Sequence, residues 1–144
     1  MDAFDADALI YAAVPGHPLG RRVAALFTAA PRDSADPPDG SGSLLLLPEV
    51  LGKPLRDGAT DEVRALAALL GRLELHPLDR ATAELATALS GRYGLRAADA
   101  VHLATAVTTG ADRFITNNER DFTPQIAEVK VTYPADLPEP ERDA

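Results

Sequence analysis

The stretch Phe4–Ala13, FDADALIYAA, joins the end of a short apolar segment to the start of a helical one. Two carboxylates, Asp5 and Asp7, stand at this junction, and an apolar run follows them. A strand that leads at once into a helix is the first half of an alternating α/β pattern. An acid at such a junction either caps the helix or serves a site beyond the end of the strand. The rest of the sequence bears on which of the two applies.

The composition is that of one ordinary globular domain. The chain has 144 residues, with 46% hydrophobic and 25% charged, which suits a single core. It has no cysteine, which excludes disulfides and thiolate zinc sites and leads us to expect a cytoplasmic protein. The acidic N-terminus is unlike a secretory signal, and the longest aliphatic run, Leu44–Leu47, is far too short to cross a membrane.

The net charge of −8 is unevenly distributed along the chain. Residues 135–144 contribute −3 and residues 31–43 contribute −2, which leaves −3 for the remainder. Surfaces that bind nucleic acids are usually basic, so the charge argues against a broad, unaided RNA-binding face. It does not exclude an RNA substrate that is bound locally.

Segments typical of strands alternate with one or two helical segments. The stretch 31–43, rich in Pro, Gly, Ser and Asp, is predicted to be a long exposed loop. Residues 1–134 are predicted to form the domain, and residues 135–144 an acidic, Pro-rich tail. The alternation predicts a three-layer α/β/α fold around a parallel sheet of roughly five strands. The predicted strands are residues 1–5, 44–47, 73–76, 113–116 and 129–133.

Acidic side chains fall where these strands end. Asp5 ends the first predicted strand, and Glu49 lies two residues beyond the second. The stretch TNNERDF, residues 116–122, begins where the fourth strand ends. Asp99 lies in the first turn of the helix before the fourth strand, and it joins the same edge if that helix is a return connection. Sites in open α/β sheets form beyond the carboxyl ends of the strands, so we expect these side chains to meet there.

Carboxylates gathered at one edge would repel one another, whereas Mg²⁺ or Mn²⁺ would stabilise the cluster. The 116–122 stretch adds Asn118, whose amide oxygen can ligate a hard cation without bringing charge, and Asp121. A site of this kind supports metal-assisted hydrolysis of a phosphodiester, because a divalent cation offsets the charge that develops on the phosphate.

Four stretches occur in an order and at a spacing shared with a known family. They are FDADALIYAA, LLLLPEVLGKPLRDG, LRAADAVHLATAV and ADRFITNNERDF, and they span most of the chain up to Phe122. Together they resemble the PIN domain family, most of all the VapC-type ribonuclease toxins of bacterial toxin–antitoxin pairs. The resemblance implies a PIN-like fold and a Mg²⁺- or Mn²⁺-dependent endoribonuclease with Asp5, Glu49 and Asp99 as its core metal-binding acids. It also implies a homodimer that an antitoxin neutralises.

One position departs from the family pattern. Asn118 stands where many relatives carry a fourth acid after the residues TN. The number of metal ions therefore stays open between one and two, and Asp121 is a further candidate ligand. An alternative function also stays open: a catalytically weak or inactive PIN-fold module that binds RNA or a partner protein.

The acids also have purely structural interpretations. Asp7 is expected to cap the first helix or to support Asp5 from behind. Glu49 and Asp99 each suit the first turn of a helix, where a carboxylate complements the helix dipole. Only their combined pattern favours metal binding over this role.

Three further polar residues carry two interpretations each. Thr116 is either a β-branched strand end or a hydroxyl near the metal. Arg120 either contacts a substrate phosphate or is a solvated surface arginine. His102, three residues after Asp99, is expected to be a packed core histidine rather than a ligand.

The helical segments also predict partners. The stretches ALIYAAV, LGRRVAALF and VRALAALLGRL give more apolar helix surface than a small sheet must cover, which predicts a homodimer. An antitoxin segment is expected to place a basic side chain near the acids, because an unfilled acidic cluster is stabilised by a counter-charge.

Overall fold

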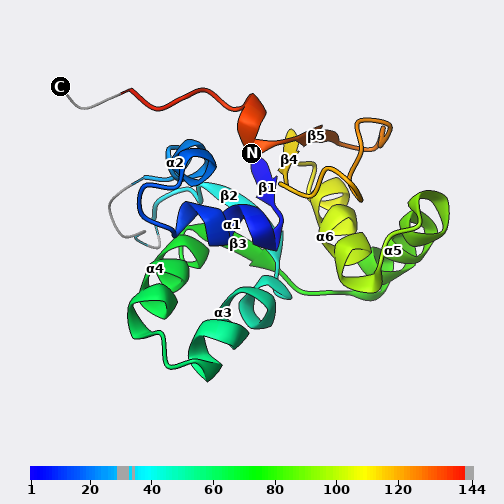
Figure 1. The fold of residues 1–144 in the computed structure, drawn as a ribbon. Coiled ribbons are helices and arrows are strands. Elements are labelled where there is room, and N and C mark those ends of the chain that lie inside the picture. The colour runs from blue at the N-terminus through cyan, green and yellow to red at the C-terminus, as the bar shows by residue number, and fades with distance from the viewer. Residues whose placement is uncertain (29–32, 34, 142–144) are drawn as a thin grey trace.

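In the computed structural model, which describes residues 1–28, 33 and 35–141, the chain forms a five-stranded parallel sheet with helices on both faces (Figure 1). The strand order is β3-β2-β1-β4-β5, and every neighbouring pair is parallel. The predicted α/β class and sheet are therefore confirmed. The strands are β1 Asp2–Phe4, β2 Gly40–Ser43, β3 Leu73–His76, β4 Arg113–Ile115 and β5 Lys130–Thr132.

Helices α1 to α4 gather on one side of the sheet, and α5 and α6 lie on the other (Figure 1). Within the described ranges, no helix is both long and apolar enough to cross a membrane. The α-helices in this part of the chain are α1 Ala6–Ala12, α2 Pro18–Ala24, α3 Leu46–Arg56, α4 Thr60–Leu70, α5 Arg80–Tyr93 and α6 Ala97–Thr108, and a 3₁₀ helix, η1, covers Pro134–Asp136.

Two cores flank the sheet because successive residues of a strand face opposite sides. Ala3 of β1 and Phe114 of β4 enter the core that α5 and α6 cover. Phe4 and Ile115, the next residues of the same strands, enter the core under α1, α3 and α4. The central strands are thus buried on both faces, as expected for a parallel sheet.

The second strand lies earlier in the sequence than predicted. The structure places β2 at Gly40–Ser43, while the run Leu44–Leu47 turns into α3. The predicted strand at Leu44–Leu47 is therefore wrong, and the predicted loop 31–43 ends in a strand. Residues 29–32 and 34 of this region lie outside the described residues.

The glycines of β2 explain why a strand forms there. A Cβ atom on Gly40 would stand 2.5 Å from the ring of Phe4, and one on Gly42 would stand 2.4 Å from Cδ1 of Leu46. These distances are too short for real atoms, so neighbouring side chains occupy the space that β2 leaves. A strand made of glycine and serine has no apolar alternation by which it can be recognised.

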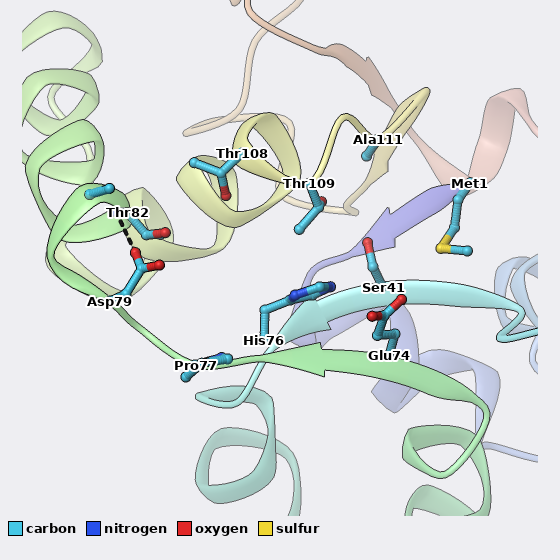
Figure 2. A pocket seen from close by; sticks show the side chains of 11 residues that line it. Met1, Ser41, Glu74, His76, Pro77, Asp79, Thr82, Thr108, Thr109 and Ala111 are labelled. Carbon is cyan, nitrogen blue, oxygen red and sulfur yellow. Dashed lines mark hydrogen bonds between the residues drawn. The ribbon is translucent and has the colours of Figure 1, made fainter. Parts of the chain in front are cut away.

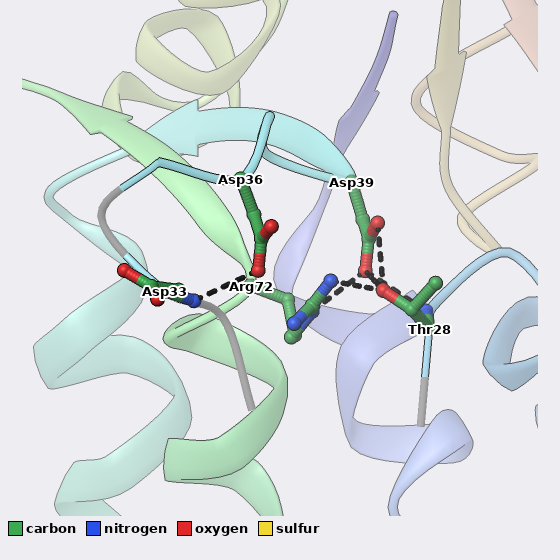
Figure 3. A network of polar contacts seen from close by, with 5 residues as sticks. All are labelled: Thr28, Asp33, Asp36, Asp39 and Arg72. Atoms are coloured by element: carbon green, nitrogen blue, oxygen red, sulfur yellow. Dashed lines mark hydrogen bonds and ion pairs between the residues drawn. The ribbon is translucent and has the colours of Figure 1, made fainter. Parts of the chain in front are cut away.

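A polar network fastens the start of β2 to the start of β3 (Figure 3). Nε of Arg72 donates to Oδ2 of Asp39 at 2.8 Å, and both side chains are largely buried. The backbone N–H and hydroxyl of Thr28 also donate to this carboxylate, and Arg72 donates to the same hydroxyl. The guanidinium holds the pKa of Asp39 at about 2. Beside this group, the N–H of Asp33 donates to Asp36 at 3.0 Å.

The segment after β5 packs against α2. The guanidinium of Arg22 donates to the carbonyl oxygens of Ala135 and Leu137 at 2.8 and 2.9 Å, and to Glu139 at 2.8 Å. Leu137 is buried in the core with α1 and α3. The first residues of the predicted tail 135–144 thus belong to the packed structure, and the boundary at residue 134 stays a prediction.

Candidate metal centre

Asp5 lies at the carboxyl end of β1, the middle strand of the sheet. Its N–H donates to the carbonyl of Ile115 at 2.9 Å, which extends the pairing of β1 with β4 by one residue. Its Oδ1 accepts from the N–H of Ala6 at 2.9 Å, and its Oδ2 accepts from the hydroxyl of Thr116 at 2.8 Å. Burial raises the pKa of Asp5, although His102 and Thr116 oppose the shift. Two hydrogen bonds therefore fix the carboxylate, and its burial disfavours the ionised form.

Asp7 lies in the first turn of α1, but it does not cap the helix. Asp5 occupies the N-cap position, so the prediction that Asp7 is the cap is wrong. Oδ1 of Asp7 instead accepts from the N–H of Asn117 at 3.1 Å, which links α1 to the loop after β4. Burial and the charge of Asp5 raise the pKa of Asp7 to about 6.

Glu49 lies in the first turn of α3 and reaches across to α6. Its Oε2 lies 3.1 Å from Nε2 of His102, whose side chain is 1% exposed against 33% for Glu49. Burial opposes the charged form of His102, but the hydrogen bond to Glu49 and the charge of Asp5 outweigh it and raise the pKa. His102 is buried, as its sequence context predicts. The sequence does not predict its bond to Glu49, which joins residues 53 positions apart.

Asp99 is half-buried in the first turn of α6. Burial raises its pKa, and the charges of Asp121 and Glu49 raise it further, against the effect of His102. The charge of Asp99 in turn raises the pKa of Asp5. The sheet edge therefore brings the predicted acids close enough for Asp99 to interact electrostatically with both of the others.

The polar side chains of the loop after β4 form hydrogen bonds with one another. Nδ2 of Asn118 donates to Oδ2 of Asp121 at 2.9 Å, and Oδ1 of Asn118 accepts from the N–H of Asp121 at 3.2 Å. Nε of Arg120, whose side chain is 80% exposed, donates to Asp121 at 3.3 Å. Hydrogen bonds from Asn118 and Arg120 lower the pKa of Asp121. These bonds hold Asn118 and Asp121 together, and Oδ1 of each residue keeps a lone pair that could ligate a cation.

The candidate acids do not converge on one point in the structure. Among the residues that the structure describes, no three His, Cys, Asp or Glu side chains lie close enough to hold a metal ion together. The chemistry of the donors nevertheless fits a hard divalent cation, because Asp5, Asp7 and Asp99 all have pKa values raised by burial and by neighbouring carboxylates. A cation would relieve that repulsion, and its binding requires side-chain rotations toward a common centre.

A cavity of about 470 Å³ lies away from these acids, beside β2 and β3 and the adjoining ends of α5 and α6 (Figure 2). Ser41, Glu74 and His76 line it from the strands. Asp79 also lines it. As the N-cap of α5, this residue accepts a hydrogen bond from the N–H of Thr82 at 2.8 Å. None of the predicted acids lines this cavity, so it is not the candidate centre.

Comparisons with known proteins agree with this architecture. The model of the PIN domain family matches residues 3–128. A solved toxin–antitoxin complex from Klebsiella pneumoniae contains a chain that is similar over 95% of this chain and 100% of that one, with a TM-score of 0.71 and 26% sequence identity. No curated protein sequence matches the chain.

Proposed function

The chain belongs to the PIN domain family, and on that premise we propose that it is a metal-dependent endoribonuclease toxin, with Asp5, Glu49 and Asp99 as its core acids. The observation that carries the proposal is Asp5. It is a buried carboxylate at the carboxyl end of the central strand, with a raised pKa and with the charge of Asp99 acting on it. Acids perturbed by burial and by like charges are typical of functional sites.

A divalent cation, Mg²⁺ or Mn²⁺, would supply Lewis acidity and offset the charge that develops on the RNA phosphate. The chain's part is to hold the ligands. The N–H of Ala6 and the hydroxyl of Thr116 fix both oxygens of Asp5 before any substrate binds. Glu49 on α3 and Asp99 on α6 approach from helical layers on opposite faces of the sheet, so the ligand set bridges both layers.

The other candidate residues take supporting roles in this proposal. Thr116 and Asp7 orient the acids and the loop after β4. Asn118 and Asp121, which hydrogen-bond to each other, are the further candidate ligands. Arg120, with its exposed side chain, is the candidate contact for a substrate phosphate.

Partners follow from the same premise. The similarity to a chain in a toxin–antitoxin complex supports a cognate antitoxin, which we expect to place a basic side chain near the acids. A homodimer is proposed from the family and from the apolar helices, and light scattering of the purified protein measures it. The alternative of a non-cleaving module that binds RNA or a partner rests on Asn118 in place of a fourth acid.

Cleavage of RNA by the purified protein in Mn²⁺, in Mg²⁺ and in EDTA tests the activity. We expect metal-dependent cleavage that Asp99→Asn lowers by about 100-fold or more, as for loss of a group that stabilises charge in the transition state. Asp61→Asn is the matched control, because Asp61 is an exposed acid in the first turn of α4. Equal, small effects of the two variants would mean that Asp99 serves only its helix dipole. RNA binding without cleavage in Mn²⁺ would favour the non-cleaving module.

A further inference from the structure

We propose that His102 is a positioning residue that holds Glu49 for metal binding, an inference that rests on the proposed function. Nε2 of His102 and Oε2 of Glu49 lie 3.1 Å apart. The two residues belong to α6 and α3, which lie on opposite sides of the sheet (Figure 1). The contact therefore joins the two helical layers at the candidate centre.

The two side chains differ in what fixes them. His102 is 1% exposed and is held by the packing of α6, whereas the side chain of Glu49 is 33% exposed on the first turn of α3. A partly solvated glutamate has many rotamers to lose when it is held in one geometry. The buried ring is therefore the fixed partner, and the carboxylate is the one that it orients.

The two ring nitrogens of His102 show which residue donates the hydrogen bond. An ionised carboxylate only accepts hydrogen bonds, so Nε2 of His102 carries the hydrogen and donates it to Glu49. Nδ1 is buried and has no hydrogen-bond partner among the described residues. An unpaired buried polar atom destabilises the fold, so an apolar side chain would serve simple packing better. The neutral and the charged ring donate the same bond, so the proposal does not depend on the protonation state of His102.

The bond orients Glu49 and leaves its carboxylate able to ligate a cation. His102 donates to Oε2, and Oε1 accepts no hydrogen bond from the residues that the structure describes. Carboxylates that ligate metals are commonly held by such outer hydrogen bonds, and their loss typically lowers metal affinity 10- to 100-fold. His102 lies on the same helix as Asp99, one turn further along, so α6 carries one ligand and the support of another.

Two variants of similar volume separate the hydrogen bond from packing. His102→Leu fills the space without a donor, and His102→Gln offers an amide N–H at a similar reach. Calorimetric titration with Mn²⁺ alone, without RNA, gives the affinity of each protein. We expect His102→Leu to bind Mn²⁺ about 10- to 100-fold more weakly than the wild type and His102→Gln to recover most of the loss. Cleavage by His102→Leu should return toward the wild-type rate at saturating Mn²⁺, because only the affinity is impaired.

Other patterns of Mn²⁺ affinity overturn the inference. Mn²⁺ affinity of His102→Leu equal to or above that of the wild type would mean that His102 does not support Glu49. Equal losses in His102→Leu and His102→Gln, with native circular dichroism in both, would mean that the hydrogen bond is not the cause. If His102→Leu does not fold, His102→Asn, which is too short to reach Glu49, replaces it and must show the same loss. A wild type that binds no Mn²⁺ overturns the inference and the proposed function together. A wild type that binds Mn²⁺ without cleaving RNA overturns only the nuclease, and the affinities still decide the role of His102.

Discussion

Gly20 lies where α2 crosses the end of α1, and the contact leaves no room for a side chain. A Cβ atom on Gly20 would stand 1.9 Å from the carbonyl oxygen of Tyr11 and 2.6 Å from its carbonyl carbon. The first turn of α2 is also tied to α1 by His17, whose Nδ1 accepts from the N–H of Gly20 at 3.0 Å and whose ring stacks on Tyr11. We therefore expect Gly20→Ala to force α2 away from α1.

The expected loss follows from two opposing effects. Alanine in place of glycine stabilises an open helix by about 0.5–1 kcal/mol. At Gly20 the backbone must instead move by about 1.5 Å, from 1.9 Å to the 3.4 Å of an ordinary contact, and overpacking of this kind typically costs about 1–3 kcal/mol. The obstacle is backbone rather than the end of a flexible side chain, so we expect a net loss of about 2 kcal/mol.

Gly52→Ala is the matched control for this prediction. Gly52 lies inside α3, and a Cβ atom there would meet nothing within 4 Å. We expect the free energy of unfolding to rise by about 0.5–1 kcal/mol in this variant, opposite in sign to Gly20→Ala. Urea unfolding followed by circular dichroism measures both variants under the same conditions. A Gly20→Ala variant as stable as Gly52→Ala would refute the close packing of α1 and α2.

Three further changes test other parts of the molecule. Arg72 lowers the pKa of Asp39 from 3.8 to about 2, so the ionised pair stabilises the fold above pH 4 and its contribution is lost as the pH falls toward 2. Asp39→Asn should accordingly lower the free energy of unfolding at pH 7 by up to about 2 kcal/mol and have little effect near pH 2, as measured in urea. The pKa of Asp7 is raised to about 6, so its charge destabilises the fold above that pH and has no effect below pH 3.8. Asp7→Asn should therefore stabilise the metal-free protein in EDTA by up to about 3 kcal/mol at pH 8, and the gain should vanish near pH 3. Thr116→Val removes the hydroxyl that donates to Asp5 and should weaken Mn²⁺ binding about 10-fold in calorimetry, while an unchanged affinity would show that this bond does not orient the ligand.

The fold was predictable where the sequence carries a period or a cap. Asp79 and Gly94 bracket α5 as cap residues, and the alternation of strands with helices predicts the parallel sheet. The position of β2 was not predictable, because glycine and serine form a strand only where neighbouring side chains fill the space. The leucines at 44–47 carry the stronger apolar signal, but they open a helix.

The sequence predicts at which edge of the sheet the candidate centre lies, but not the contacts between its side chains. Strand ends in a parallel sheet meet on one side, which is why the sequence predicts Asp5 at this edge. Glu49 was assigned to the same edge through a strand at 44–47, and the structure places it in the first turn of α3 instead. Which of Asp5 and Asp7 caps α1 depends on the hydrogen bond from Asn117, which is 110 residues away along the chain. The bond between Glu49 and His102 joins two residues that lie 53 positions apart on different helices, and no local pattern reports such a contact.

A Mn²⁺ soak of a crystal, measured at the manganese absorption edge, tests the proposed centre most directly. The proposed function predicts an anomalous peak at the carboxyl edge of the sheet, with carboxylate oxygens of Asp5, Glu49 and Asp99 about 2 Å from it. The strength and number of peaks would also count the ions and show whether Asn118 or Asp121 takes part. An edge without a peak at a Mn²⁺ concentration that supports RNA cleavage, or a peak bound only by other residues, would contradict the assignment.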